Sequence, residues 1–432
     1  MDGSYRVACL VSHPIQYQAP LFRYLAARPG IELTVFFLSD LSVHAYRDSG
    51  FGVDVKWDVP LLDGYRHEFL PRVGSGSGLS FWRPWTFGLR ARLRRGQFDA
   101  LWVHGYAHRG CLAGIAAAKS LGIPVMLRGE SNLLSETDDA LKLGVKRIAI
   151  PALLRTIDAT LAIGRLNREY YLHYGVGADR IFAMPYAVDN EFFRSAADRA
   201  RPERETLRVD LRLQPGRPVI LFASKMQPHK RAGDLLEAYA RLSSDGIAEP
   251  VPYLIFAGDG EDRAQLEHRA TALKWDSIRF IGFRNQSELP ALYDLCDVFV
   301  LPSEREPWGL VVNEAMNAGK VVIVSDRVGA GPDLVDDGLN GFIYPARDVA
   351  ALADRLRQLL ENPEHRAAMG ARALETVARF DFAADREGLL AALDSVARKN
   401  LSIVRSAAND PASPYQGEAD ARLRASGEGP NS

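Results

Sequence analysis

Two glutamates in the segment LPSEREPWGLVVNEAMNAGK are the first candidates for chemistry, because they flank the expected start of a helix. A buried strand is predicted over residues 298–301 and a helix over residues 308–318, which Gly319 ends. Glu306 then lies just before the helix, and Glu314 lies inside it. The first turn of this helix offers unpaired backbone N–H groups, those of Gly309, Leu310 and Val311.

These N–H groups form a candidate anion site. They lie at the positive end of the helix dipole, which suits a phosphate or the negative charge that develops on a leaving group. The two carboxylates beside the anion site suit hydroxyl groups of a sugar and of a ribose. Spacing alone leaves open that both glutamates are solvated charges at a helix end.

Two lysines follow another expected strand, residues 219–223, in the loop before the next helix. Lys225 and Lys230 are placed to neutralise a diphosphate leaving group. Taken alone, the same two residues are equally typical of surface lysines.

Polar side chains also follow three expected strands of the amino-terminal half. Ser12, His13 and Gln16 follow the first strand, without the G-x-G-x-x-G pattern of a dinucleotide site. His104 follows the strand at residues 100–104. The pair Arg128 and Glu130 follows the strand at residues 124–128. Ligands bind at the carboxyl ends of parallel strands, so these groups together indicate one cleft, although each alone fits a local hydrogen bond.

Composition excludes several classes of protein. The chain has 432 residues, of which 47% are apolar and 25% charged, as in soluble globular proteins. Its net charge of −1 does not suggest a nucleic-acid partner. No D-x-D motif and no metal-ligand spacing is present, so neither a metal site nor metal-dependent chemistry is predicted. Three distant cysteines and no signal-peptide core favour a reduced, cytoplasmic protein.

Strands and helices alternate along most of the chain, which predicts an α/β protein with parallel sheets. About twelve strands favour two sheets, one in each half. A charged segment without apolar periodicity, residues 198–206, marks the expected boundary. The expected division is therefore residues 1–197, 207–380, an amphipathic helix at 381–401 and a disordered tail at 402–432.

The motifs of the second half resemble the retaining nucleotide-sugar glycosyltransferases of family four, which have the two-domain GT-B fold. The Glu-x7-Glu pair lies among FAGDGED, FIGF, LYDLCDVFVLPS and GAGPDLVDDGLNGFIYP, in the order of that family. The resemblance spans about residues 5–399. It implies two Rossmann-like, doubly wound parallel-sheet domains that face each other across a cleft.

The resemblance also implies roles for residues. Glu306, Lys230 and His104 would be the catalytic set, with Glu306 and His104 on the donor sugar and Lys230 on the diphosphate. The remaining donor-binding residues would be Lys225, Gly282, Phe283, Ser303, Gly309, Leu310, Val311 and Glu314, with Glu314 on the ribose and Gly282 and Phe283 beside the base.

The sequence departs from the family at several positions. Lys225 replaces the usual Arg, and Arg231 replaces the usual Gly after the second lysine. The amino-terminal glycine-rich loop and a histidine-containing loop are both replaced. The acceptor or sugar side is therefore predicted from position alone, as Ser12, His13, Gln16, Arg128 and Glu130.

The implied reaction is transfer of a sugar, with retention, from a nucleoside-diphosphate sugar to an acceptor hydroxyl. UDP is the expected nucleotide from family frequency. The acceptor would be a glycan, a lipid-linked molecule or a small molecule, in cell-surface polysaccharide or glycolipid synthesis, and no cofactor beyond the donor substrate is expected. A non-catalytic sugar-nucleotide-binding subunit, a same-fold epimerase and the much larger glycan phosphorylases are the alternatives.

Two basic segments raise the possibility of peripheral membrane contact. Residues 141–158 mix lysines and arginines with Ile, Leu and Ala, although Pro151 interrupts the amphipathic pattern. Arginines at 90, 92, 94 and 95 form a second basic cluster. An ordinary helix with a solvated basic face explains both segments equally well.

Overall fold

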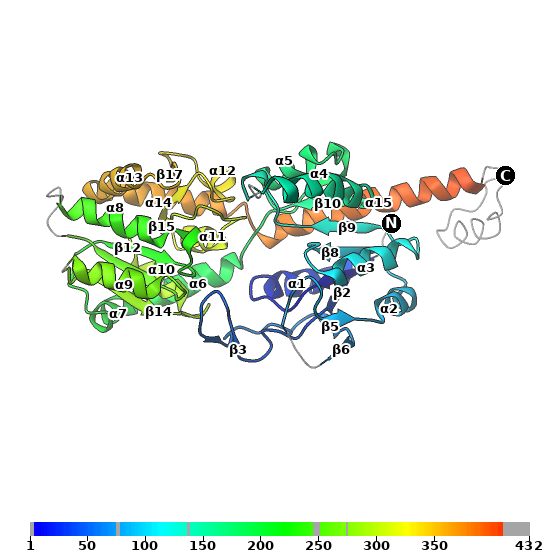
Figure 1. Cartoon of the computed structure of the whole chain (residues 1–432), viewed down its shortest axis with the longest axis horizontal. Helices are drawn as coiled ribbons and strands as arrows, with labels where there is room; N and C mark the ends of the chain where they lie inside the picture. Colours follow the sequence, from blue (N-terminus) through cyan, green and yellow to red (C-terminus); the bar gives the residue numbers. More distant parts are fainter. Residues whose placement is uncertain (1–3, 75–77, 136–138, 245–250, 274, 409–432) are drawn as a thin grey trace.

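A computed structural model describes residues 4–74, 78–135, 139–244, 251–273 and 275–408 of the chain. Figure 1 shows two α/β halves side by side along the long axis, each built on its own parallel sheet. The predicted fold class, two Rossmann-like doubly wound domains, is confirmed. Among the described residues, none of the helices is long and apolar enough to cross a bilayer.

The amino-terminal sheet has seven strands in the order β11-β10-β9-β8-β1-β2-β5. Their bounds are Tyr5–Val11 (β1), Ile31–Phe37 (β2), Arg66–Phe69 (β5), Ala100–His104 (β8), Val125–Arg128 (β9), Ala159–Ala162 (β10) and Ile181–Ala183 (β11). Helices α1 (Ala19–Ala26), α2 (Leu89–Gly96), α3 (Arg109–Lys119), α4 (Ala140–Arg155) and α5 (Arg165–His173) belong to this half. Strand β5 was not predicted, because its sequence RHEF lacks an apolar run.

The carboxyl-terminal sheet has six strands in the order β14-β13-β12-β15-β16-β17. Their bounds are Val219–Ala223 (β12), Tyr253–Ala257 (β13), Ile278–Gly282 (β14), Val298–Leu301 (β15), Val321–Ser325 (β16) and Gly341–Tyr344 (β17). The helices are α6 (Asn190–Ala200), α7 (Arg204–Asp210), α8 (Ala232–Ser244), α9 (Arg263–Ala272), α10 (Leu289–Leu295), α11 (Leu310–Asn317), α12 (Gly331–Leu334), α13 (Val349–Glu361) and α14 (Pro363–Val377).

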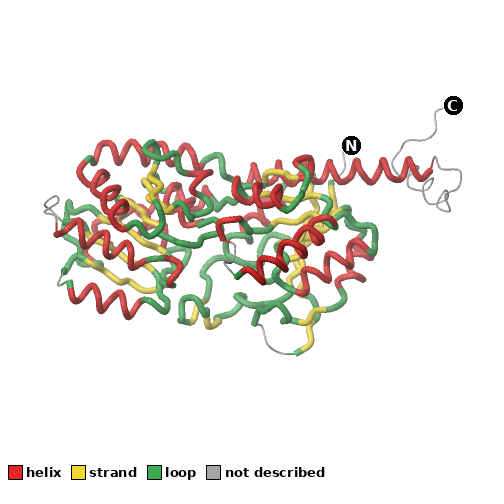
Figure 2. Tube along the Cα trace, turned by 45° about the horizontal axis from the view of Figure 1, so that its top comes forward, coloured by secondary structure: helices red, strands yellow, loops and turns green. Residues whose placement is uncertain are grey.

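The central strands are buried on both faces, which explains their continuous apolar sequences. In β12, Leu221 faces one apolar cluster and Phe222 faces the other, and both side chains are inaccessible to solvent. Helices lie on either side of the strands in both halves (Figure 2). The covered sheets hold rigid strand ends, and loops carry the polar side chains at those ends.

Two short antiparallel hairpins project from the amino-terminal half. Strands β3 (Tyr46–Arg47) and β4 (Asp54–Val55) form the first hairpin. Strands β6 (Arg72–Val73) and β7 (Trp85–Thr86) form the second. Sequence patterns did not predict either hairpin, because their strands are only two residues long.

The chain enters the carboxyl-terminal half before the predicted domain boundary at residues 198–206. Helix α6, which precedes this segment, already packs against α10 and α11 of the carboxyl-terminal half. Arg204 forms an ion pair of 2.6 Å with the buried Asp294 of α10, and Arg201 lies 3.5 Å from the same carboxylate. The charges that suggested a linker therefore anchor this segment to a domain, and the chain crosses between domains before α6.

Helix α15 (Phe382–Ala408) crosses back and packs on β10, β11 and α1 of the amino-terminal half. The helix extends past the predicted end at residue 401, so the tail predicted from residue 402 is helical through Ala408. No Gly or Pro interrupts the chain between Gly388 and Pro411, which allows the helix to continue. Residues 409–432 of the predicted tail lie outside the described residues.

Candidate active site

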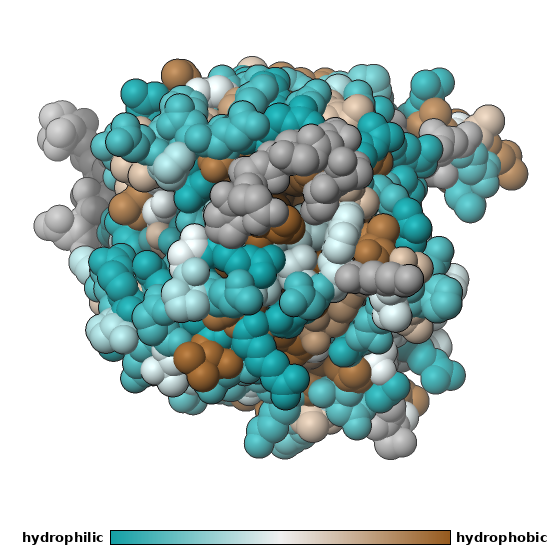
Figure 3. Space-filling view, turned by 90° about the vertical axis from the view of Figure 1, so that its left-hand side faces the viewer, coloured by the Kyte–Doolittle hydropathy of each residue, from teal (hydrophilic) through white to brown (hydrophobic). Residues whose placement is uncertain are grey.

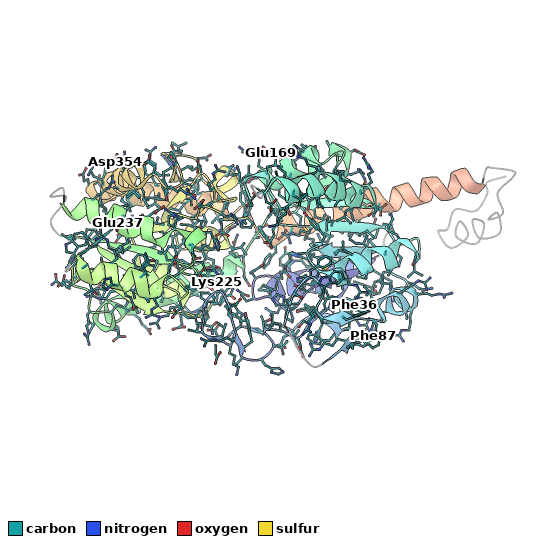
Figure 4. The ribbon with its side chains drawn as sticks, in the orientation of Figure 1. Phe36, Phe87, Glu169, Lys225, Glu237 and Asp354 are labelled. Carbon is teal, nitrogen blue, oxygen red and sulfur yellow. The ribbon has the colours of Figure 1, made fainter. Side chains whose placement is uncertain are left out.

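Two adjoining cavities lie where the carboxyl ends of the two sheets meet. The first cavity, of about 410 Å³, is lined by residues from both domains, including Asp48, Lys225 and Glu314. The second cavity, of about 440 Å³, is lined mainly by the amino-terminal domain, with Pro307 from the other domain. Ile15 lines both cavities. Figure 4 shows Lys225 at the junction of the two halves.

The two cavities bring together ten of the residues predicted from the sequence. The first cavity is lined by His13, Gln16, Lys225, Lys230, Phe283, Val311 and Glu314. The second is lined by Ser12, His104 and Glu130. Six predicted residues line neither cavity, and these are Gly282, Ser303, Glu306, Gly309, Leu310 and Arg128.

Glu306 does not line the first cavity, but it is paired with Lys230, which does. The Lys230 ammonium donates to the Glu306 carboxylate, and both side chains are largely buried. The hydroxyl of Ser303 lies 3.5 Å from the same carboxylate oxygen. The pair places a cation at the cavity wall and a carboxylate directly behind it. Such a cation can stabilise negative charge that develops on a bound group.

Close backbone packing fixes the loop that carries Glu306. The N–H of Gly329 donates to the Glu306 carbonyl over 2.9 Å. A Cβ on Gly329 would lie 1.9 Å from the Pro307 carbonyl oxygen, so only glycine fits there. Gly309 has a φ of +100°, which favours glycine, and it caps α11. These two glycines hold the loop against the start of the helix.

Arg231 occupies the position where the family that this sequence resembles has glycine. The backbone conformation of Arg231 explains why that family prefers glycine there. Its φ is +54°, in the left-handed region, which costs a non-glycine residue roughly 1–2 kcal/mol. The guanidinium makes two hydrogen bonds to Asp234, of 2.8 and 2.7 Å, at the start of α8. The ion pair holds the backbone turn that presents Lys230.

Glu314 lies in the second turn of α11 and faces the first cavity. The Tyr293 hydroxyl donates to its carboxylate over 2.6 Å. Burial raises the pKa of Glu314 to about 7. Near neutral pH this carboxyl can therefore accept a hydrogen bond or donate one, which suits a pair of ligand hydroxyls. Val311, which also lines the cavity, is in the first turn of α11, where backbone N–H groups have no partner within the helix.

Lys225 is held across the cleft by the β3–β4 hairpin. Its ammonium lies 2.9 and 3.1 Å from the two carboxylate oxygens of Asp48. Burial alone would raise the pKa of Asp48. Lys225 and the N–H groups of Phe51 and Gly50 lower the pKa by more than burial raises it, so the pKa of Asp48 lies below its ordinary value. Asp48 is therefore ionised at neutral pH and neutralises Lys225 in this structure.

The same hairpin region brings aromatic rings onto Phe283. The Phe51 ring is 4.8 Å from the Phe283 ring, edge to face, and the Trp57 ring is 6.0 Å away. Four residues that line the first cavity were not predicted from the sequence, and these are Tyr46, Asp48, Phe51 and Trp57. No local motif marks these residues. The only signal is an aromatic-rich stretch with short turns, which is not specific for a site.

His104 lies in the second cavity as a neutral imidazole. Burial lowers its pKa to about 3. The Gln18 side chain amide contacts the ring over 2.9 Å. A neutral ring cannot supply a full positive charge near pH 7, so His104 is suited to hydrogen bonding rather than to proton donation. His13 is similar, because burial lowers its pKa to about 4.

Glu130 forms the inner wall of the second cavity. The Tyr186 hydroxyl donates to its carboxylate. Burial raises the pKa of Glu130, and the nearby charge of Glu306 raises it further. Glu130 is thus a carboxyl group fixed by one neighbour, with a second oxygen available for a ligand hydroxyl.

Arg128, predicted as an acceptor-side residue, lines neither cavity. Its side chain is buried beneath the sheet and forms an ion pair of 3.0 Å with Asp385 of α15. It also donates to the carbonyl oxygens of Met184 and Pro185, each over 3.1 Å. β9 is buried on both faces, so its sequence could not show which face Arg128 would take. In the described part of the chain, no group of three His, Cys, Asp or Glu side chains could hold a metal ion.

Family comparisons match both halves of the chain. The model described as glycosyl transferases group 1 matches residues 203–376. The model described as a glycosyl transferase 4-like domain matches residues 14–187. The chain passes from one matched region to the other between residues 187 and 203. Helix α6 lies in this interval and packs on the carboxyl-terminal domain.

Two curated relatives show the extent of the sequence similarity. D-inositol 3-phosphate glycosyltransferase of Corynebacterium glutamicum is 32% identical over 234 residues, which are 53% of this chain and 55% of the relative. Alpha-D-kanosaminyltransferase of Streptomyces kanamyceticus is 26% identical over 305 residues, which are 66% of this chain and 74% of the relative. The chain thus spans about half the length of the first relative.

Solved structures share the fold over more than nine-tenths of the chain. Anabaena Alr3699/HepE in complex with UDP has a TM-score of 0.68 and 19% identity, over 91% of this chain and 100% of the other. Sucrose-phosphate synthase from Thermosynechococcus elongatus has a TM-score of 0.66 and 18% identity, over 93% and 100%. At these identities the likeness establishes the arrangement of the two domains only.

Proposed function

Because the chain belongs to the group 1 glycosyl transferases, we propose that it moves a sugar from a nucleoside-diphosphate sugar to an acceptor hydroxyl, with retention of the anomeric configuration. The observation that carries this proposal is the first cavity. It places Lys225, Lys230 and Glu314 around one space, with Glu306 directly behind Lys230. Cations for a diphosphate and a carboxyl for a ribose are therefore within reach of one ligand.

The donor nucleotide is proposed to occupy the first cavity. Its base would lie beside Phe283, where Phe51 and Trp57 add aromatic surface. Its ribose would bind Glu314, and its diphosphate would lie between the two lysines and the start of α11. UDP is the proposed nucleotide. The Anabaena protein named above was solved with UDP, which supports this choice without deciding it.

The sugar is proposed to extend from the diphosphate toward Glu306 and the second cavity. As the bond to the diphosphate breaks, the sugar carbon becomes oxocarbenium-like and the phosphate gains negative charge. Lys230 and Lys225 stabilise that charge. The neutral imidazole of His104 hydrogen-bonds a sugar hydroxyl. The acceptor oxygen attacks from the face that the phosphate leaves, and the departing phosphate takes the acceptor proton, so no covalent enzyme intermediate forms.

The second cavity favours transfer over epimerisation, the same-fold alternative. An epimerase needs room for one sugar nucleotide only, whereas the second cavity, of about 440 Å³, extends past His104, the proposed contact of the donor sugar, to Lys146 and Ser135. Glu130 offers a carboxyl oxygen to an acceptor hydroxyl there. We propose that the acceptor binds in this second cavity.

The first test is the thermal stability of the protein with UDP, GDP or ADP. A ligand at 100 times its Kd adds about 2.7 kcal/mol to the free energy of unfolding. We expect UDP to raise the melting temperature of the wild type, and Glu314→Ala to remove most of that increase because the ribose loses its carboxyl partner. Glu361→Ala, an exposed position on α13, is the matched control. If no nucleotide shifts the wild type, the proposed function is wrong.

Asp48→Asn is expected to strengthen UDP binding about fivefold, because a partly exposed ion pair of roughly 1 kcal/mol no longer competes for Lys225. Isothermal titration with UDP measures the change. Asp54→Asn on the same hairpin, where the exposed carboxylate is 3.7 Å from Arg47, should leave the affinity unchanged. An unchanged or weaker affinity for Asp48→Asn would contradict placement of the diphosphate at Lys225.

A further inference from the structure

An exposed aromatic surface lies on strands β6 and β7 and on the described residues 81–87 around β7. Five large apolar side chains are between 44% and 68% exposed, and these are Val73, Phe81, Trp82, Trp85 and Phe87. Val73 and Trp85 are cross-strand neighbours in the hairpin. The Phe81 and Trp82 rings contact each other edge to face, with centroids 4.9 Å apart. Clustered exposed aromatics of this kind mark an interaction surface.

Positive charge surrounds this aromatic surface. Residues 71–120 contain seven arginines and one lysine, against a single acidic residue, Asp99. Acidic residues outside this segment pair with Arg72, Arg92 and Lys119, which leaves five arginines to supply the positive charge. The Arg109 guanidinium lies 4.2 Å above the Trp85 ring. Within the described residues, no ion pair is recorded for the exposed Arg83, Arg94 or Arg95. The partner of this surface must therefore tolerate its positive charge or supply negative charge.

A second exposed apolar stripe lies on α4. Leu141, Val145 and Ile148 follow the i, i+4, i+7 spacing of one helix face, and all three are at least 60% exposed. Arg147 is exposed on the same helix. The opposite side of α4 packs into the domain core through Ile150 and Leu154. The three side chains of the exposed stripe therefore take no part in the packing of the domain core.

Both apolar segments border the second cavity. On one side, His108 lines the cavity, and its ring contacts the Ser80 carbonyl over 2.9 Å. The N–H of the next residue, Arg109, donates to the carbonyl of Phe81 in the aromatic segment. On the other side, Lys146 of α4 lines the cavity. The cavity proposed for the acceptor thus lies beside the exposed apolar side chains of both segments.

We propose that the amino-terminal domain docks onto an anionic phospholipid bilayer through these two segments, named here the docking face. Trp and Phe side chains partition into the interfacial region of a bilayer, and arginines beside them bind lipid phosphates. The excess of one charge sign on the aromatic segment disfavours a second copy of this chain as the partner, because like charges would meet. The inference rests on the proposed function, and it assigns the acceptor to molecules held at a membrane.

The carboxyl-terminal domain offers a contrast. Its outer end is mostly hydrophilic, and hydrophobic residues are scattered there (Figure 3). Phe87 of the docking face lies on the far side of the amino-terminal half from Lys225 (Figure 4). The exposed apolar residues of the docking face do not line the first cavity. Their substitution therefore leaves the nucleotide cavity intact, which allows membrane binding and nucleotide binding to be tested separately.

The test is flotation of the full chain with phosphatidylcholine vesicles that contain about 30% phosphatidylglycerol or none. We expect binding to the anionic vesicles only, weakened by salt. Trp82→Ser with Trp85→Ser should reduce this binding at least about tenfold, and Leu141→Ser with Ile148→Ser should also reduce it. Leu339→Ser, an exposed apolar position on the other domain, is the matched control and should bind like the wild type.

The melting shift with UDP, measured on the same variants, separates the two proposals. An unchanged UDP shift with lost flotation supports the docking face. If none of UDP, GDP and ADP shifts the melting temperature of any protein, and flotation is still lost only in the docking-face variants, the proposed function is refuted and the membrane surface remains. The docking face is refuted if the wild type does not float, if it floats equally with neutral vesicles, if the tryptophan variant floats like the wild type, or if the wild type is a dimer that this variant dissociates.

Discussion

Lys230→Ala is expected to lower the turnover number about 100- to 1,000-fold, the usual effect of removing one preorganised charge from a transition state. The reason is the position of the ammonium at the wall of the first cavity, held in a largely buried pair with Glu306. The charge that it stabilises appears on the diphosphate only as the sugar bond breaks. Initial rates of sugar transfer at saturating donor measure the loss.

A second variant separates chemistry from folding. Lys230→Ala leaves the largely buried carboxylate of Glu306 without its cation, which itself lowers the free energy of unfolding. Lys230→Ala with Glu306→Gln removes that cost, so stability should recover while turnover does not. Lys320→Ala, whose ammonium donates to the Asp294 carbonyl, is the control for loss of a lysine. A turnover within tenfold of the wild type in Lys230→Ala would exclude the proposed role.

Arg128→Ala is expected to lower the free energy of unfolding by about 3–5 kcal/mol, the cost of leaving one partner of a buried ion pair alone. Both side chains are 1% exposed, and the guanidinium also satisfies two backbone carbonyl groups. Asp385 would remain in the interior without its cation. Urea denaturation at neutral pH measures the change.

The cost of Arg128→Ala should depend on pH. Burial raises the pKa of Asp385 to about 7, even though Arg128 lowers it. A protonated carboxyl needs no cation, so the loss of stability should be smaller at pH 5 than at pH 8. Arg128→Met with Asp385→Leu should be close to neutral or stabilising, because it removes both buried charges. An equal loss in the single and double variants would contradict this explanation.

The fold could be predicted because its strands are long apolar runs separated by helical patterns. Strand β5 escaped prediction since it lies at the sheet edge and its RHEF sequence is polar. The start of the carboxyl-terminal half was expected later in the chain for a different reason. Charge in residues 198–206 suggested a linker, yet Arg204 and Arg201 are tied to a buried aspartate. Local composition does not show a long-range partner.

The candidate site could be predicted only where its residues follow strands in the sequence. Lys230 and Glu314 were found by that rule, and both line the first cavity. Asp48 and Phe51 were not found, because they reach the cavity from a hairpin that is about 175 residues from Lys225 along the chain. Arg128 obeyed the positional rule and still lines neither cavity, since position after a strand does not fix the direction of a side chain.

Helix α15 has a consequence for the order in which the protein is completed on the ribosome. Its residues Phe382, Leu389, Leu393 and Val396 belong to the apolar core of the amino-terminal domain. At Gly388 the helix backbone lies so close to the Ala183 carbonyl that a Cβ would be 1.7 Å away. The amino-terminal domain therefore stays open on one face until residues 382–396 have been synthesised. The amino-terminal domain can finish folding only after the carboxyl-terminal domain has been made, which reverses the usual vectorial order.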